Sequence, residues 1–413
     1  MANLNASTNC GVDYDVLNNA SLPDEYKQLP EEVLDRRITE AKAKLGKRLV
    51  ILGHHYQRDE IIKYADYRGD SLKLSQLAAQ RKDAEFIVFC GVHFMAESAD
   101  ILSAKNQIVI LPNLEAGCSM ADMANIGQVE TCWQELEEAG VINPASGMKS
   151  SSSFPTPKDT IGVIPITYIN SSANLKAFVG KHGGAVCTSS NAKAIVSWAL
   201  NHPLAPSLIK EGELKEGRKE RKILFFPDQH LGRITCLGLG IPLTDMVLWN
   251  PFEYMGGYEP ADLQKAKVLL WKGHCSVHMR FKLEQVEKAR REYPGIRVIV
   301  HPECTLDVVQ AADEYGSTEV IYRRIKESPA GSKWAVGTEV NLVNRMQEEM
   351  PDKTIFCLDP VVCPCETMYR IHPSYLCWVL ENLVQGRVVN QIKVPDEIKQ
   401  WAKVALDRML EIR

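Results

Sequence analysis

The sequence lacks the features of a membrane or secreted protein. No stretch approaches the roughly 18 consecutive apolar residues that a membrane-spanning helix needs. The N-terminus shows neither a basic leader nor the apolar segment of a signal peptide. We therefore expect a cytoplasmic protein with no membrane partner.

An excess of charge of one sign is also missing. The formal net charge is −4 and the sequence pI is about 6.2, with Lys and Arg spread along the chain. The only basic cluster, residues 214–222, is typical of a solvated loop between a helix and a strand. Because nucleic-acid binding needs a basic surface, we expect no nucleic-acid partner.

Short β-branched runs alternate with amphipathic helical stretches through most of the chain. RLVILGHHY, EFIVFCGVHF and QIVILPNL are strand-like, and DSLKLSQLAAQRK between the first two is helix-like. This order is typical of βαβ units with a parallel sheet. At 413 residues, 45% hydrophobic and 24% charged, the chain is long enough for two to four compact units.

The same order of elements occurs three times, and each copy ends in a cysteine. We therefore predict an α/β fold of three homologous three-layer αβα lobes, with parallel sheets around a pseudo-threefold axis. The predicted domains are an N-terminal extension (1–28), three lobes (29–124, 125–276 and 277–366) and C-terminal helices that pack across lobes (367–413). The second lobe is expected to carry a flexible insert near 140–160.

Twelve cysteines in a chain without a signal peptide indicate free thiols and metal ligands rather than disulfides. Cys118, Cys275 and Cys365 each follow a strand-like run, so each is expected near the carboxyl end of a strand, where parallel α/β folds bind ligands. Three thiolates can hold a metal centre with one open coordination position. Five others are interpreted as inert, mostly buried thiols: Cys10, Cys132, Cys187, Cys236 and Cys377.

The spacing of the three cysteines leaves the kind of metal open. They are separated by 157 and 90 residues, and the CPC sequence is too tight for the usual zinc knuckle. An iron–sulfur cluster accepts thiolates from distant segments, and three of them leave one iron free to act as a Lewis acid. A zinc site and plain structural cysteines remain alternatives.

Polar residues at the predicted strand ends suggest a substrate site. Ser, Thr and Asn beside Gly at helix N-termini suit a phosphate or carboxylate, although each is also a common N-cap. His301 and Glu303 follow a strand and form a candidate acid–base pair, for which a structural ion pair or a cap is the alternative. His54 and Tyr56 are suited to binding an oxygen or moving a proton.

At this point the motifs resemble those of the quinolinate synthase family, in order and across nearly all of residues 35–395. They are GHHYQ, GDSL, GVHFMAESADIL, GCSMAD, ITYINSSA, VCTSSNA, PDQHLG, GHCSVH, VHPE, GST, VGTEV and CPCETM. The resemblance implies a transferase or lyase-type enzyme that condenses iminoaspartate with dihydroxyacetone phosphate to quinolinate, phosphate and two waters in NAD biosynthesis. It also implies one 4Fe–4S cluster per chain, and iminoaspartate supplied by L-aspartate oxidase.

Carried over to this sequence, the resemblance assigns three groups of residues. The cluster ligands are Cys118, Cys275 and Cys365, the last supported by Met368 three residues later. Cys357 and Cys363 are near enough to compete with Cys365 or to form a redox-active pair. Catalysis is expected from Glu303, His301, Tyr56 and His54. Substrate binding is expected from His54, Ser71, Tyr168, Asn170, Ser189, His301, Glu303, Ser317 and Thr318.

Two other functions remain compatible with the same residues. A zinc-dependent lyase or aldolase would keep the hydroxyl-bearing helix tips and Glu303. A non-catalytic iron–sulfur sensor would need neither the His301 and Glu303 pair nor those tips.

Overall fold

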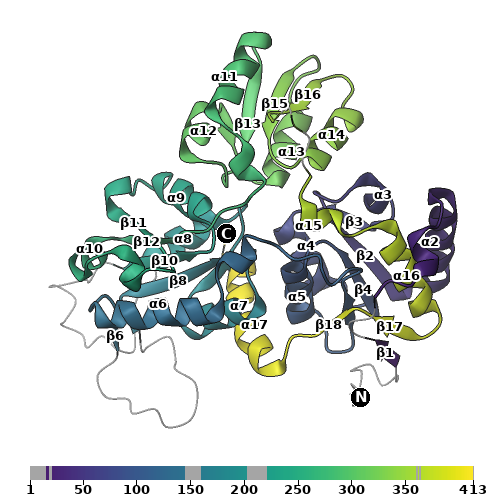
Figure 1. The fold of residues 1–413 in the computed structure, drawn as a ribbon, viewed down its shortest axis with the longest axis horizontal. Coiled ribbons are helices and arrows are strands. Elements are labelled where there is room, and N and C mark those ends of the chain that lie inside the picture. The colour runs from purple at the N-terminus through teal and green to yellow at the C-terminus, as the bar shows by residue number, and fades with distance from the viewer. Residues whose placement is uncertain are drawn as a thin grey trace. The chain divides into compact units, whose positions relative to one another are not determined.

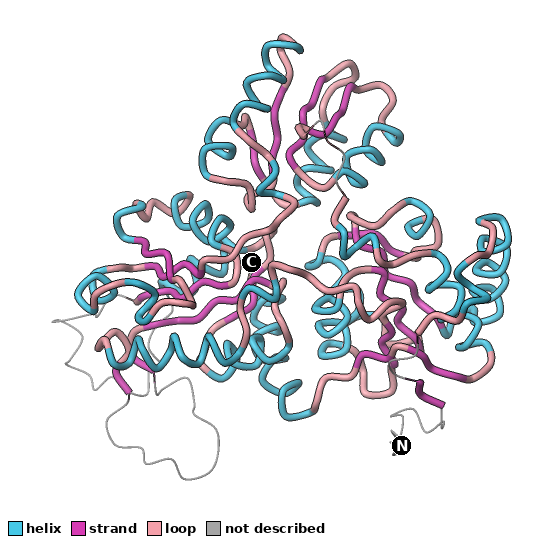
Figure 2. Tube along the Cα trace, viewed as in Figure 1, coloured by secondary structure: helices cyan, strands magenta, loops and turns pink. Residues whose placement is uncertain are grey.

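The chain is built from parallel sheets flanked by helices. The computed structural model describes residues 15–17, 21–144, 160–201, 221–359, 361 and 364–412. Its strands form three larger sheets, each between layers of helices (Figures 1 and 2). The contacts within the chain divide it into two compact units. Unit 1 is Met1–Cys118, Arg280–His301 and Ala311–Pro395, and unit 2 is Ser119–Met279, Pro302–Gln310 and Asp396–Arg413.

The first sheet belongs to unit 1 and has the order β18-β5-β4-β2-β3. Its strands are β2 (Leu49–His54), β3 (Tyr67–Gly69), β4 (Phe86–Cys90), β5 (Ile108–Ile110) and β18 (Gln391–Ile392). All pairs are parallel except that of β18 with β5. Every residue of β2 and β4 is buried, which explains their unbroken apolar runs. The flanking helices are α2 (Glu31–Leu45), α3 (Asp59–Ile62), α4 (Ser71–Gln80), α5 (His93–Leu102) and α16 (Pro373–Val384).

The second sheet belongs to unit 2, is entirely parallel and has the order β11-β12-β10-β8-β9. Its strands are β8 (Val163–Tyr168), β9 (Ala185–Cys187), β10 (Lys222–Phe226), β11 (Met246–Trp249) and β12 (Val268–Trp271). The helices are α6 (Ile126–Glu138), α7 (Ala173–Lys181), α8 (Ala192–Asn201), α9 (Gln229–Leu237), α10 (Pro260–Lys265) and α17 (Asp396–Glu411). A Cβ at Gly180 of α7 would lie 2.0 Å from the Trp401 carbonyl oxygen, so only glycine allows α17 to pack this closely.

The third sheet, in unit 1, has the order β14-β13-β15-β16 and is also entirely parallel. Its strands are β13 (Arg297–Val300), β14 (Glu314–Tyr315), β15 (Lys333–Gly337) and β16 (Thr354–Cys357). Neighbouring helices in the chain are α11 (Leu283–Glu292), α12 (Leu306–Ala311), α13 (Thr318–Glu327), α14 (Val340–Glu349) and α15 (Glu366–Tyr369). Trp334, Ile321 and Met346 are fully or almost fully buried in the apolar core between the sheet and α13 and α14.

Two short strand pairs complete the described fold. In unit 1, β1 (Asp15–Leu17) pairs in parallel with β17 (Arg387–Val389), so part of the predicted N-terminal extension is a strand. The helix α1 (Asp24–Lys27) follows, and Tyr26 donates from its hydroxyl to Glu381 of α16 over 2.7 Å. In unit 2, β6 (Asn143–Pro144) pairs with β7 (Thr160–Ile161) at the base of the predicted insert.

The predicted α/β class with three parallel-sheet lobes is confirmed, while the pseudo-threefold axis and the domain boundaries stay predictions. Each predicted lobe contains the strands of one sheet, except that β18 joins the first sheet from the C-terminal segment. Of the predicted C-terminal helices, α16 packs on α2 and α17 packs on α7. Most of the serine-rich insert, Cys10 and Cys363 lie outside the described residues. No helix within the described ranges is long and apolar enough to cross a membrane.

Candidate active site

Within unit 1, the predicted site residues lie at strand ends and helix starts. His54 is the last residue of β2, and His301 follows β13; both are buried. Ser71 begins α4, where the N-cap is the preceding Asp70, which accepts from the backbone of Lys73 over 2.9 Å. Ser317 is itself the N-cap of α13 and Thr318 begins that helix. A capping role is therefore present at Ser317, beside any role in ligand binding.

Within unit 2, Tyr168 ends β8, Asn170 lies just after it, and Ser189 lies in the turn before α8. The Oδ1 atom of Asn170 is buried and has no hydrogen-bond partner among the described residues. A buried acceptor without a partner is costly, so it favours a ligand that donates to it. This observation supports the predicted binding role of Asn170.

A buried lysine lies under the same loop and was not singled out from the sequence. Lys176 of α7 is completely buried, and its Nζ donates to the carbonyl oxygen of Ser171. The hydroxyl of Ser171 in turn donates to the Tyr168 carbonyl oxygen over 2.8 Å. These bonds anchor the segment that carries Tyr168 and Asn170 to the first turns of α7.

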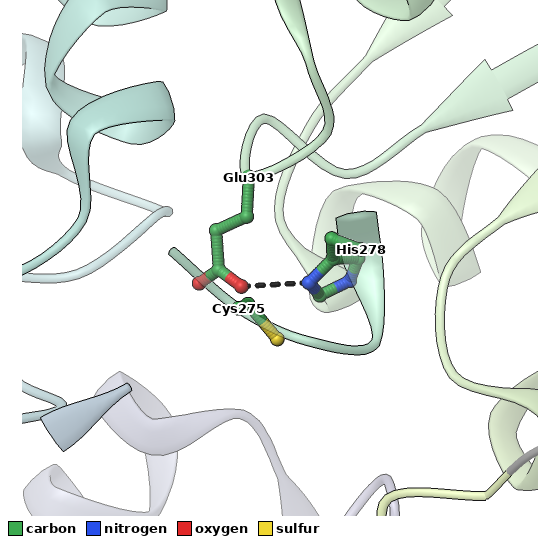
Figure 3. Close-up of side chains that lie close together, drawn as sticks. All are labelled: Cys275, His278 and Glu303. Atoms are coloured by element: carbon green, nitrogen blue, oxygen red, sulfur yellow. Dashed lines mark ion pairs between the residues drawn. The ribbon is translucent and has the colours of Figure 1, made fainter. Parts of the chain in front are cut away.

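Glu303 and His278 form a buried acid–base pair in unit 2. The Nδ1 atom of His278 lies 2.7 Å from a carboxylate oxygen of Glu303, and both side chains are at most 3% exposed. Figure 3 shows the two groups facing each other, with the Cys275 side chain beside them. One ligand atom from each of the three residues lies within 4.8 Å of the others, so the group has the composition of a metal site.

His278 was not predicted, and the expected partner of Glu303 was His301. The sequence places His278 three residues after Cys275 in the GHCSVHM loop, where a 3₁₀ turn spans His278–Arg280. The backbone N–H of His301 donates to the Gly337 carbonyl oxygen over 3.0 Å. The catalytic role of His301 stays a prediction.

Asp228 is a second buried acid of unit 2 and was also missed. It follows β10, caps α9 by accepting from the Leu231 N–H over 2.6 Å, and is completely buried. Its Oδ2 atom has no hydrogen-bond partner among the described residues. Burial, and then the charge of Glu303, raise the pKa of Asp228 well above its ordinary value. A neutral carboxylic acid close to Glu303 is able to donate a hydrogen bond or a proton.

A close backbone approach joins the Asp228 loop to the Cys275 loop. Asp228 forms an isolated parallel bridge with Gly273, and the Gln229 N–H donates to the Gly273 carbonyl oxygen over 3.0 Å. A Cβ at Gly273 would lie 2.3 Å from the Pro227 carbonyl oxygen, so glycine is required there. The two strand-end loops therefore hold each other in place.

The described cysteines differ in burial in a way that separates the predicted ligands from most of the others. None of the ten described cysteines forms a disulfide, and six are buried: Cys90, Cys132, Cys187, Cys236, Cys304 and Cys377. Cys118, Cys275 and Cys365 are only partly buried and lie in loops after β5, β12 and β16. Partly exposed thiols after one strand of each larger sheet fit metal ligands, whereas fully buried thiols fit packing.

Cys357 is also partly buried but is a poorer ligand candidate than Cys365. It is the last residue of β16, and its Sγ donates to the Thr338 carbonyl oxygen over 3.8 Å. Burial raises the pKa of Cys357 to about 11, which disfavours the thiolate. Burial also raises the pKa of Cys365, but a hydrogen bond with the Thr367 hydroxyl opposes that rise.

The fold and the site together define the class of protein: an α/β enzyme with three larger sheets of mainly parallel strands and buried acid–base groups in its strand-end loops. The model of the family described as Quinolinate synthetase A protein matches residues 36–411. The chain belongs to the quinolinate synthetase A family.

Several curated relatives cover almost the whole chain, and each is named quinolinate synthase. The protein of Herpetosiphon aurantiacus is 56% identical over 94% of this chain and 95% of its own length. That of Corynebacterium glutamicum is 53% identical over 95% of this chain and 90% of its own length. That of Acidobacterium capsulatum is 52% identical over 94% of this chain and 96% of its own length.

Proposed function

We propose that this protein is a quinolinate synthase, which condenses iminoaspartate with dihydroxyacetone phosphate to quinolinate, phosphate and two waters. The observation that carries the proposal is the buried pair of Glu303 and His278 in a chain of the quinolinate synthetase A family. Ring formation from these substrates requires protons to move at carbon and at oxygen, and a carboxylate–imidazole pair can both accept and deliver them.

The proposed proton carriers are groups held away from water. Glu303 accepts a proton from substrate carbon, with Nδ1 of His278 lying 2.7 Å from its carboxylate. Asp228, kept protonated by burial, is positioned on the same unit to serve as an acid. The proposed proton transfer is assisted by three side chains at or near the strand ends of unit 1: His301, His54 and Tyr56.

Substrate binding is proposed for the helix starts and for the loop after β8. The unpartnered Oδ1 of Asn170 accepts from a donor group of the substrate, and Tyr168 lies beside it in the chain. Backbone N–H groups and hydroxyls at the starts of α4, α8 and α13 suit the carboxylates and the phosphate: Ser71, Ser189, Ser317 and Thr318.

A 4Fe–4S cluster, one per chain, is proposed to be held by Cys118, Cys275 and Cys365. The donor set fits, because all three are partly buried thiols, outside any disulfide, in loops that follow strands. With three thiolate ligands, such a cluster supplies a Lewis-acidic iron that binds and polarises a substrate oxygen or nitrogen. The cluster implies oxygen sensitivity, and the reaction implies a cytoplasmic role in NAD biosynthesis with iminoaspartate supplied by L-aspartate oxidase.

One observation favours a second candidate, a zinc-dependent lyase. A thiol, an imidazole and a carboxylate converge at Cys275, His278 and Glu303, and these are typical zinc ligands. In that enzyme Glu303 would bind the metal instead of carrying protons.

The experiment that decides between them combines an assay with metal analysis. The protein is purified without oxygen, its iron, sulfide and zinc are measured, and quinolinate formation is assayed with and without an iron chelator. Quinolinate formation that is lost with iron supports the proposal. A colourless protein with one zinc per chain and no quinolinate formation would favour the zinc enzyme.

A further inference from the structure

A short segment of unit 1 at the start of α14 contacts two parts of the proposed site. We call residues 338–345 the α14 start, and residues 54–59, which run from the last residue of β2 to the first residue of α3, the 54–59 loop. The hydroxyl of Tyr56 lies 2.7 Å from Oγ1 of Thr338, and Nδ2 of Asn341 donates to the Tyr56 carbonyl oxygen over 3.3 Å. Both the hydroxyl and the backbone carbonyl of Tyr56 are therefore contacted by the α14 start.

Arg345 adds further bonds to the same loop. Arg345 is 4% exposed, and its guanidinium donates to the carbonyl oxygens of His55 and Gln57, over 2.9 and 2.5 Å, and to Oδ1 of Asp59 over 2.5 Å. A planar guanidinium that satisfies three acceptors of one loop restricts the loop to one conformation.

Glu339 lies at the centre of the α14 start and is completely buried. Its Oε2 accepts from the backbone N–H groups of Asn341, over 2.8 Å, and Leu342, over 3.4 Å. Its Oε1 accepts from Nδ2 of Asn341 over 2.9 Å and from the backbone N–H of Cys365 over 3.2 Å. One carboxylate thus connects Cys365 to the amide that holds Tyr56.

These bonds exceed what capping of α14 requires. An N-cap needs one side-chain oxygen, and Asp, Asn, Ser and Thr are preferred there because they are short. Oε2 alone makes the capping bonds of Glu339, while Oε1 reaches Cys365 and Asn341. The extra length of glutamate, compared with the usual N-cap residues, is explained by the contacts of its second oxygen, Oε1, with Cys365 and Asn341.

We propose that Glu339 is a positioning residue that fixes the backbone of Cys365 and, through Asn341, the backbone of Tyr56 in one arrangement. The inference rests on the proposed function for what Cys365 and Tyr56 do, but the restraint itself is a property of this chain. Glutamine is a poor replacement, because its amide nitrogen would face N–H donors whichever way it is turned. Mutation of a residue that hydrogen-bonds a metal ligand typically lowers metal affinity or activity by roughly 10–100-fold.

The test compares four full-length proteins purified without oxygen: the wild type, Glu339→Gln, Glu339→Asp and Asn341→Ala. Glu348→Gln, an exposed residue of the same helix, is the matched control. Two properties are measured besides activity. One is the rate of iron release to a chelator, and the other is the alkylation rate of Cys365 in metal-free protein, read by peptide mass spectrometry.

Both Glu339 variants are expected to alkylate at Cys365 and to release iron about 10-fold faster than wild type, with kcat reduced about 10–100-fold. Asn341→Ala is expected to lower kcat with alkylation of Cys365 and iron release close to wild type. Glu348→Gln is expected to match wild type throughout. Glu339→Asp keeps a carboxylate at the N-cap, but its side chain is too short to reach the Cys365 N–H. It therefore tests the restraint on Cys365 even if Glu339→Gln does not fold.

The inference is overturned if a folded Glu339 variant shows wild-type alkylation of Cys365 and wild-type iron release. It is also overturned if Asn341→Ala accelerates both as much as the Glu339 variants do. Failure of the proposed function looks different: the wild type itself would hold no iron and form no quinolinate. The alkylation of Cys365 in metal-free protein would still decide whether Glu339 restrains that residue.

Discussion

The Nδ1 atom of His278 lies 2.7 Å from a carboxylate oxygen of Glu303, and neither side chain is exposed to solvent by more than 3%. A charge on a side chain this deeply buried is stable only when it is paired with an opposite charge or hydrogen-bonded. Under the proposed function, this pair exchanges protons with the bound substrate. Two predictions follow from it, one for activity and one for stability.

Replacing Glu303 by Gln is expected to lower kcat for quinolinate formation by about 10²–10⁴-fold, because the amide cannot accept a proton from carbon. Iron content and circular dichroism are expected to stay at wild-type values. Glu348→Gln, the same change at an exposed position, is the control. Wild-type turnover by the Glu303 variant would remove this residue from the proposed proton transfer.

Replacing His278 by Leu is expected to lower the free energy of unfolding of metal-free protein by about 3 kcal/mol, since it leaves Glu303 buried without its imidazole partner. Urea titration measures this change. The double variant with Glu303→Leu is expected to recover part of the loss, because no buried charge remains. If the double variant loses a free energy of unfolding equal to the sum of the losses in the two single variants, the two side chains do not interact.

Arg345→Lys tests the bonds that hold the 54–59 loop. Lysine keeps the charge but cannot donate to His55, Gln57 and Asp59 together, so the free energy of unfolding is expected to fall by about 2–4 kcal/mol. Arg68→Lys is the control, because its ion pair with Glu349 is at the surface and is expected to change stability by less than about 1 kcal/mol. Equal effects of the two changes would contradict the proposed restraint.

His230 gives a prediction for pH. Burial, followed by the charges of Arg233 and His274, lowers the pKa of His230 to about 4 from the usual 6.5. A histidine with a lowered pKa binds its proton more weakly in the folded chain, so its contribution to stability is present above about pH 6.5 and is lost toward pH 4. Between pH 7 and 4.5 the loss amounts to about 2 kcal/mol.

His230→Gln is expected to reduce this pH dependence by the same amount, because glutamine does not titrate. The measurement is urea unfolding of metal-free wild type and variant at the two pH values. Parallel losses of stability in the two proteins would show that His230 is protonated as easily in the folded chain as in the unfolded one.

The periodicity of the sequence predicted most strands of the three larger sheets, but not β3, β14 or β18. β2, β4 and β12 are short apolar runs followed by polar or glycine-containing tips, and runs of this kind predict buried parallel strands. β18 was not predicted, because two residues that pair with the edge strand β5 carry no periodic pattern.

The partners within the site could not be predicted in the same way. His278 and Asp228 occur in the GHCSVHM and PDQHLG motifs, so their residue types were visible. What selects them is burial against Glu303 and the close approach of the loops at Gly273, and these depend on segments far apart in the chain. The role of Glu339 has the same origin, since its bond to Cys365 spans two separate loops.

The central claim is that Cys118, Cys275 and Cys365 together hold one cluster. Iron and acid-labile sulfide are measured in protein purified without oxygen, for the wild type and for a Ser replacement of each cysteine, with Cys357→Ser as the control. The account predicts about four irons and four sulfides per chain in the wild type and the control, and loss of most of both in each of the three variants. A full complement of iron in any of the three, or a single zinc in place of iron, would contradict it.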